Sequence, residues 1–143
     1  METKIILLSS LIVTAFLTGL IWFVQVVHYP SFGKVPPEGF DTFHHFHVSA
    51  TGLVVMLPML TELILAFAML AVANNIGTWQ KITLSGIVFA LWGLTFFVFV
   101  PLHGQLSAGF NQAVIDKLVK WNWVRTFLWT VRLVGLSVLV FRG

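Results

Sequence analysis

The sequence predicts an all-α integral membrane protein, a four-helix transmembrane bundle with a short interfacial helix before its fourth span. Hydrophobic residues make up 58% of the 143 residues and charged residues only 9%, with a mean hydropathy of +0.95, which is outside the range of soluble domains. The apolar residues form four stretches, each long enough to cross about 30 Å of hydrocarbon. We therefore expect a single transmembrane domain over residues 1–143, with spans at 5–27, 45–73, 82–102 and 121–141.

The first span is uncharged and too long for a cleaved signal peptide, and the His28-Tyr29-Pro30 segment after it is no small-residue cleavage site. Residues 29–43 contain three prolines, so we expect an irregular loop, with the first helix ending near His28. Asp41 or Thr42 is the expected cap of the next helix.

The second span carries a polar face. At 100° per residue, the spacing of threes and fours places six residues within about 60° of one another. They are His44, His47, Thr51, Val55, Pro58 and Glu62. We expect this face to point inward and Pro58 to kink the helix. The segment 74–77 predicts a turn after it.

The third and fourth spans bring further polar groups. The third places Trp92 in phase with His103 at its end. Residues 107–120 have the amphipathic pattern of an interfacial helix. The fourth span contains Arg125 and Arg132, in phase with Asn122 and Trp129. Arg125 lies close enough to the end of the span to snorkel to water, whereas Arg132 lies too deep.

Four spans place both termini on one side of the membrane and all five histidines at the other. We therefore predict that His28, His44, His47 and His103 form one cluster, with His45 facing away. Basic residues are nearly balanced between the two sides of the membrane. We place the termini in the cytoplasm because Lys4 precedes the first span and because acids and histidines dilute the basic residues of the other side.

The composition also limits the partners. The chain has no cysteine, which excludes disulfides, thiolate metal sites and cysteine nucleophiles. Its few basic residues do not cluster, which argues against nucleic-acid binding. The expected partners are the lipid bilayer and a small hydrophobic substrate, and a homo-oligomer stays open.

Imidazoles are common ligands of zinc, copper and iron, so His28, His44, His47 and His103 are candidate metal ligands. A haem is less favoured because no histidine lies near the centre of a span. The identity of any cofactor stays open. An alternative function is therefore a metal- or haem-binding membrane carrier or electron-transfer protein.

Glu62 and Arg132 are expected to form a buried ion pair, because each charge is costly alone inside a bilayer. Counted from the histidine side at 1.5 Å per residue, Arg132 lies roughly 10–15 Å deep and Glu62 roughly 22–25 Å deep. A long arginine side chain and a kink at Pro58 would close most of this gap. Without a partner, Glu62 would be a catalytic carboxylate.

The segment VPLHGQLSAGF and the following NWVRTFLWTVR, residues 122–132, resemble the pattern NW-x-R-T-x-x-W-T-x-R. This pattern belongs to a family of small four-helix membrane proteins, named as a domain of unknown function, that includes anthrone-oxygenase-like enzymes. The resemblance covers about the last third of the chain specifically. It implies a membrane-embedded oxidoreductase acting on a lipophilic aromatic compound, with His103, Asn122, Arg125 and Trp129 at matching positions.

We therefore expect an oxidoreductase or oxygenase with a His/Arg/Trp-lined pocket at one membrane face. Arg125 and Asn122 would polarise a substrate oxygen, and the histidines would transfer protons or bind a metal. The predicted catalytic residues are His103, Arg125, Asn122 and Glu62. The predicted substrate-binding residues are Gln25, Trp92, Trp129 and Arg132.

Overall fold

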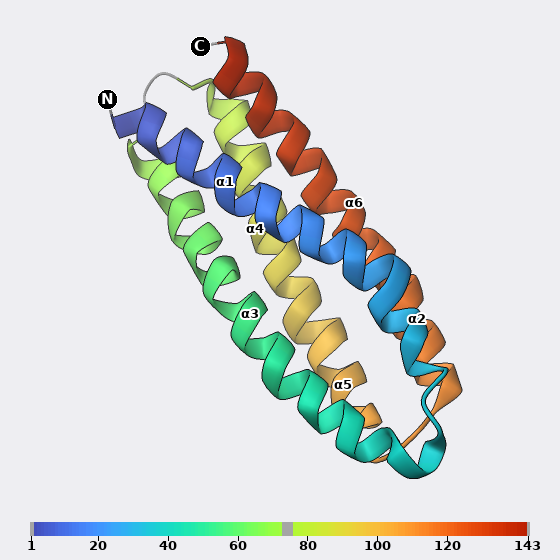
Figure 1. The fold of residues 1–143 in the computed structure, drawn as a ribbon. Helices are drawn as coiled ribbons and strands as arrows, with labels where there is room; N and C mark the ends of the chain where they lie inside the picture. Colours follow the sequence, from blue (N-terminus) through green and yellow to red (C-terminus); the bar gives the residue numbers. More distant parts are fainter. Residues whose placement is uncertain (1, 73–75, 143) are drawn as a thin grey trace.

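The computed structural model describes residues 2–72 and 76–142, and within them every element is helical. The elements form four antiparallel rods (Figure 1). The rods consist of α1 (Glu2–Phe23), η1 (Val24–His28) and α2 (Tyr29–Phe32); α3 (Pro37–Val72); α4 (Thr78–Leu94), η2 (Thr95–Phe99) and α5 (Val100–Leu106); and α6 (Gln112–Arg142). Each rod is long and apolar enough to cross a membrane, which confirms the predicted bundle. Both termini lie at one end, and the α2–α3 and α5–α6 connections lie at the other (Figure 1).

Two rods contain a π-helical turn just before a proline. The Tyr29 N–H donates to the carbonyl of Val24, and the Val100 N–H donates to the carbonyl of Thr95, each five residues back. In both rods a proline follows one residue later, and it has no N–H for the regular bond to residue i−4. The wider turn lets the helix continue through the proline and rotates the residues beyond it.

The helix boundaries at this end correct two expectations. The first rod continues through Pro30 to Phe32 instead of ending near His28. The next helix begins at Pro37, so neither Asp41 nor Thr42 is its cap. Proline is tolerated in a first helical turn because the N–H groups there have no intrahelical partner. The predicted turn at 74–77 lies partly outside the described residues.

The expected interfacial helix at 107–120 is not a separate element. From Gln112 onward these residues form the first turns of α6, which runs unbroken to Arg142. Val114, Ile115 and Leu118 are buried, so the amphipathic stripe faces the core of the bundle rather than a membrane surface. The chain turns between α5 and α6 at Gly109, whose φ of 125° disfavours any residue with a side chain.

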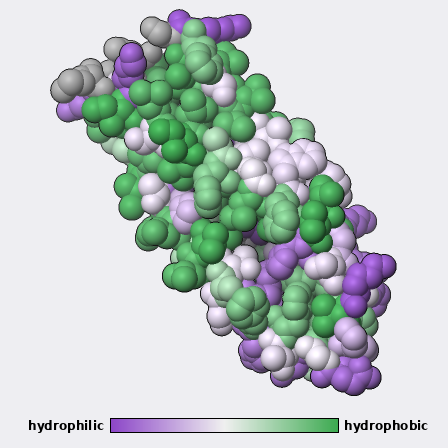
Figure 2. Space-filling model, in the orientation of Figure 1, coloured by the Kyte–Doolittle hydropathy of each residue, from purple (hydrophilic) through white to green (hydrophobic). Residues whose placement is uncertain are grey.

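The outer surface is strongly apolar along most of the bundle. Leu53 is 81% exposed and Phe97 is 84% exposed. Figure 2 shows hydrophobic residues over much of the visible face, with hydrophilic residues gathered at the two ends. A surface of this kind suits a hydrocarbon solvent and would drive association in water.

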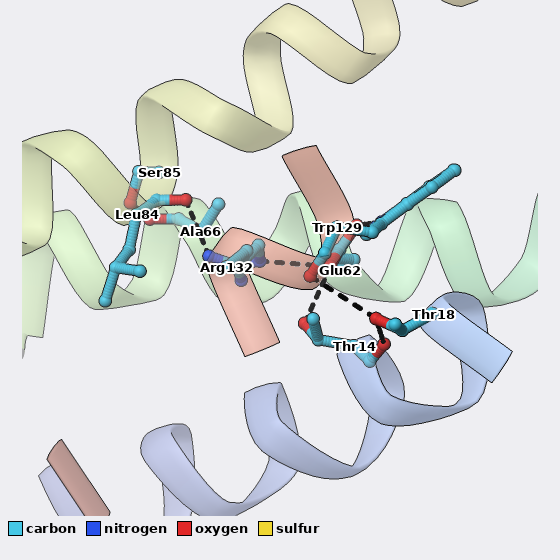
Figure 3. A network of polar contacts seen from close by, with 8 residues as sticks. All are labelled: Thr14, Thr18, Glu62, Ala66, Leu84, Ser85, Trp129 and Arg132. Atoms are coloured by element: carbon cyan, nitrogen blue, oxygen red, sulfur yellow. Dashed lines mark hydrogen bonds and ion pairs between the residues drawn. The ribbon is translucent and has the colours of Figure 1, made fainter. Parts of the chain in front are cut away.

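A buried polar network ties the four rods together at one level (Figure 3). The Arg132 Nε donates to the Glu62 carboxylate at 3.0 Å, which confirms the predicted ion pair. Thr14 and the Trp129 indole also donate to this carboxylate, at 2.7 and 3.0 Å. Arg132 Nη1 donates to the carbonyl of Leu84 at 2.6 Å. Because these residues come from α1, α3, α4 and α6, one pair of charges fixes the mutual register of all four rods.

Candidate functional site

Four histidines from three rods form one cluster at the end of the bundle away from the termini. His28 Nε2 lies 2.7 Å from His47 Nδ1, and His44 Nε2 lies 3.1 Å from His103 Nδ1. The rings of His47 and His103 stack with their centroids 5.2 Å apart. The predicted cluster is therefore confirmed. His45 is exposed and pairs with Asp41 at 3.4 Å, so it faces away as expected.

The first part of the cluster is a continuous chain of hydrogen bonds. The Tyr29 hydroxyl lies 3.2 Å from His103 Nε2, and the other nitrogen of His103 contacts His44. The remaining His44 nitrogen lies 3.5 Å from the Ser107 hydroxyl. A neutral imidazole donates from one nitrogen and accepts at the other, so both rings can take part in a single oriented chain. Ser107 is exposed, whereas Tyr29 and His44 are buried.

The second part of the cluster is shorter. His47 Nδ1 lies 2.7 Å from His28 Nε2 and 2.9 Å from the Thr51 hydroxyl. Thr51 is one helical turn after His47 on α3, so the sequence spacing itself brings the two together. His28 is half-buried, which gives this chain a route toward the outer surface as well.

In this arrangement the four histidines are not grouped around one point, as the predicted metal site would require. Ligands of one ion must direct their nitrogens at a common point. In the cluster, Nε2 of His28 points at Nδ1 of His47, and Nε2 of His44 points at Nδ1 of His103. Within residues 2–72 and 76–142, no group of three or more His, Cys, Asp or Glu side chains is arranged to hold an ion.

A cavity of about 430 Å³ lies beside the cluster. Its polar lining comprises Tyr29, His47, Thr51, Thr95, His103, Ser107 and Arg125. The rest is apolar, with side chains from α1, α3, η2 and α6. Met56 of α3 and Val100 of α5 also line it and are 50% and 55% exposed, so the cavity reaches the apolar outer surface between these helices. Its volume is typical of small-molecule sites.

Arg125 is the charged residue of this cavity. Its side chain is buried, and its guanidinium carbon lies 4.4 Å from the ring centre of Phe99 and 5.0 Å from that of Trp129. Among the described residues no carboxylate lies within ion-pair distance of it, and its Nε has no hydrogen-bond partner. The predicted roles of Arg125 and Trp129 at a pocket therefore agree with where they lie.

Three other predicted site residues pack between helices instead of lining the cavity. Asn122 Nδ2 donates to the Gln25 side chain at 3.0 Å, and Gln25 donates to the carbonyl of Val119 at 3.3 Å. The first of these hydrogen bonds links η1 to α6, while Asn122 Oδ1 is buried without a partner. Trp92 packs against the larger apolar core beside Phe96. Gln25, Asn122 and Trp92 therefore do not line the cavity in this arrangement.

Glu62 and Arg132 also lie outside the cavity lining. Their charges are used against each other, so Glu62 has no free carboxylate for catalysis and Arg132 is not positioned for substrate. The structure does not place these two residues at the cavity, because the helical face that carries them continues past it into the packed core. Whether an inward residue meets the cavity or the packed core depends on its position along the helix, not on its helical phase.

Tyr29 and Ser107 were missed from the sequence. Tyr29 is the only tyrosine and lies one turn after Gln25, so the phase of the first helix, continued past His28, would have placed it inward. It was missed because the helix was expected to end there. Ser107 gave no signal of its own, since it lies just beyond the end of α5.

Comparison with protein-family models, with curated proteins and with solved structures finds no match to this chain. The resemblance of residues 122–132 to the anthrone-oxygenase-like family therefore stays a prediction. Within that segment, Arg125 and Trp129 line the cavity and Asn122 does not.

Proposed function

We propose that this protein is a membrane-embedded oxidoreductase acting on a small lipophilic aromatic substrate. The observation that carries the proposal is the composition of the cavity. One end presents the Tyr29–His103 hydrogen bond and the guanidinium of Arg125, while most of the remaining lining is apolar. Such a cavity holds a hydrophobic ring and places its polar substituent against proton-transferring groups.

The chemistry that suits these groups begins with removal of a proton. A CH₂ group conjugated with a ketone through an aromatic ring loses a proton to His103, directly or through Tyr29, and the enolate oxygen is stabilised by Arg125. Dioxygen is the oxidant of the enolate. One oxygen atom enters the carbon and the other leaves as water, so that CH₂ and O₂ become C=O and H₂O.

The hydrogen-bonded chain supplies a path for the proton. From His103 it passes to His44 and then to Ser107, which is exposed at the end of the bundle. Neutral imidazoles suit such a relay because each accepts a proton at one nitrogen and releases one from the other. The relay thus links a cavity open to hydrocarbon with water at the membrane face.

The test is oxygen uptake by the full-length protein in nanodiscs with anthrone as the probe. We expect uptake above the protein-free rate, with conversion of the CH₂ group to a carbonyl detected by chromatography. Arg125→Met and His103→Phe should each lower the rate by about 10²-fold, the scale of one acid–base or oxyanion group. The matched control His45→Phe removes an exposed imidazole and should leave the rate unchanged. Uptake no faster than the protein-free rate would contradict the proposal.

We propose a cytoplasmic location for both termini, supported by Lys4 before the first rod and by the dilution of basic residues with acids and histidines at the other end. The chain has no cysteine, so single cysteines give a clean readout. In intact cells, Ala108→Cys should react with a membrane-impermeant maleimide and Glu2→Cys should not. The reverse pattern would invert the orientation.

A further inference from the structure

The cavity contains one charge without a counter-charge. We infer that the ligand of this cavity is a small aromatic acid bound as the anion, an inference that rests on the proposed use of the cavity for substrate. The ionised oxygen of the acid binds Arg125, and its rings occupy the apolar part of the cavity. The relevant acids are aromatic carboxylic acids, phenols and enols. A neutral or cationic compound of the same shape is a poorer ligand.

The first support is the setting of the guanidinium. Phe99 and Trp129 face Arg125 with their rings, at 4.4 and 5.0 Å from ring centre to guanidinium carbon. Ring faces attract the cation, but they do not accept the hydrogen bonds of its five in-plane N–H donors. The Nε is buried without a partner. The side chain is therefore held against two aromatic faces, and among the described residues no carboxylate balances its charge.

The second support is the charge of the whole lining. The residues around the cavity include Arg125 but no Asp, Glu or Lys. Its other polar groups are hydroxyls and imidazoles, which form hydrogen bonds without balancing a positive charge. Charges interact more strongly in apolar surroundings than in water, so an anion gains most at this position.

The third support is the shape of the site. Apolar residues such as Leu17, Ile21, Val55 and Met59 form the part of the lining away from the histidine end. The volume of about 430 Å³ suits one to three fused rings and not a lipid with two acyl chains. Arg125 thus selects the charge of the ligand, and the apolar walls select its ring system.

The experiment compares two probes of nearly equal shape, 2-naphthoate and 2-naphthamide. Binding to the full-length protein in a neutral maltoside detergent at pH 7.5 is measured by calorimetry. We expect 2-naphthoate to bind at least about tenfold more tightly than the amide, the scale of one charge-assisted hydrogen bond. Arg125→Met should bring the two affinities within about twofold, mainly by weakening the acid. Lys120→Met removes an exposed cation from the same helix and should retain the difference.

Equal affinities for the two probes in the unchanged protein would overturn the inference, and so would a difference that survives in Arg125→Met. Unchanged 2-naphthamide binding shows that this variant is folded. Should it fail to fold, Arg125→Gln replaces it: loss of the preference for the acid on removal of the positive charge supports the inference, whereas an unchanged preference contradicts it. Displacement of 2-naphthoate by phosphatidylglycerol but not by phosphatidylcholine would assign the site to a lipid headgroup and overturn the choice of a small acid. No turnover is required, so failed oxygen uptake leaves this result intact.

Discussion

Two arginines on the same helix show how differently one residue type is used in this bundle. Arg125 and Arg132 are seven residues apart on α6, and both are buried. Arg132 has a carboxylate at 3.0 Å and a backbone carbonyl at 2.6 Å. Arg125 has two aromatic faces and a cavity. The comparison teaches that a charge inside a membrane protein is assigned a role by its partner, not by its depth.

The surroundings explain the difference. At Arg132 the four rods pack closely, and the Cβ of a residue replacing Gly135 would lie 2.9 Å from Leu84. The small glycine keeps α6 near α4, so the guanidinium reaches the Leu84 carbonyl. At Arg125 the inward face of α6 borders the cavity instead. The same helical face therefore meets a packed core at one level and an open space one level nearer the histidines.

The largest effect is expected at the partnered arginine. Glu62→Gln and Arg132→Met should each lower the free energy of unfolding by about 3–5 kcal/mol, because each leaves a buried charge without compensation. The double variant should recover much of the loss, since it removes both charges. Reversible denaturation in detergent measures all three values. Strictly additive losses would show that the two groups do not act as a pair.

Trp129 connects the two regions and sharpens the comparison. Its indole N–H donates to Glu62 at 3.0 Å, while its ring lies against Arg125 and lines the cavity. Trp129→Phe keeps a ring but removes the donor, so the free energy of unfolding should fall by about 1.5–3 kcal/mol, the cost of one hydrogen bond to a charged group. Calorimetry should show a change in 2-naphthoate affinity of less than about threefold. A large loss of 2-naphthoate affinity with an unchanged free energy of unfolding would contradict this assignment. It would mean that the indole N–H serves the ligand rather than the stability of the bundle.

The sequence was sufficient for the bundle and for much of the site, because membrane spans and helical phase are local properties. Composition and run length predicted the four rods, and phase predicted that His28, His44, His47 and His103 would meet. The Glu62–Arg132 pair was predicted with a mismatch in depth that came from the assumed helix starts. Glu62 is 25 residues after the start of α3 and Arg132 is 20 after the start of α6. Five residues amount to about 7.5 Å, which an arginine side chain can span.

Other features depend on tertiary structure and could not be obtained from phase. Whether an inward residue meets a cavity or a packed neighbour depends on how closely two rods approach. Gln25 and Asn122 are inward residues that find each other, whereas Arg125, one turn from Asn122, finds open space. The π turns before Pro30 and Pro101 also shift the phase locally. Tyr29 was missed for a simpler reason, because the first helix was expected to end near His28.

The histidine end is expected to be insensitive to chelation. The imidazole nitrogens of the cluster face one another in pairs, so a chelator should change the free energy of unfolding by less than about 0.5 kcal/mol. Metal analysis of the purified protein should show well below one ion per chain. The contrary result is one transition-metal ion per chain, which chelation removes with loss of stability and which the double variant His44→Ala/His47→Ala does not retain. That result would support the four histidines as metal ligands.

The most direct test of the account measures the stability of Arg125→Met with and without ligand, beside Arg132→Met. Without ligand, Arg125→Met should change the free energy of unfolding by at most about 1 kcal/mol, because a buried charge with no carboxylate partner is replaced by an apolar group of similar size. With 2-naphthoate at 100 times its Kd, the unchanged protein should gain about 2.7 kcal/mol and Arg125→Met almost none at that concentration. A loss of about 3–5 kcal/mol in Arg125→Met, with no stabilisation of the unchanged protein by 2-naphthoate, would make both arginines structural and contradict the account.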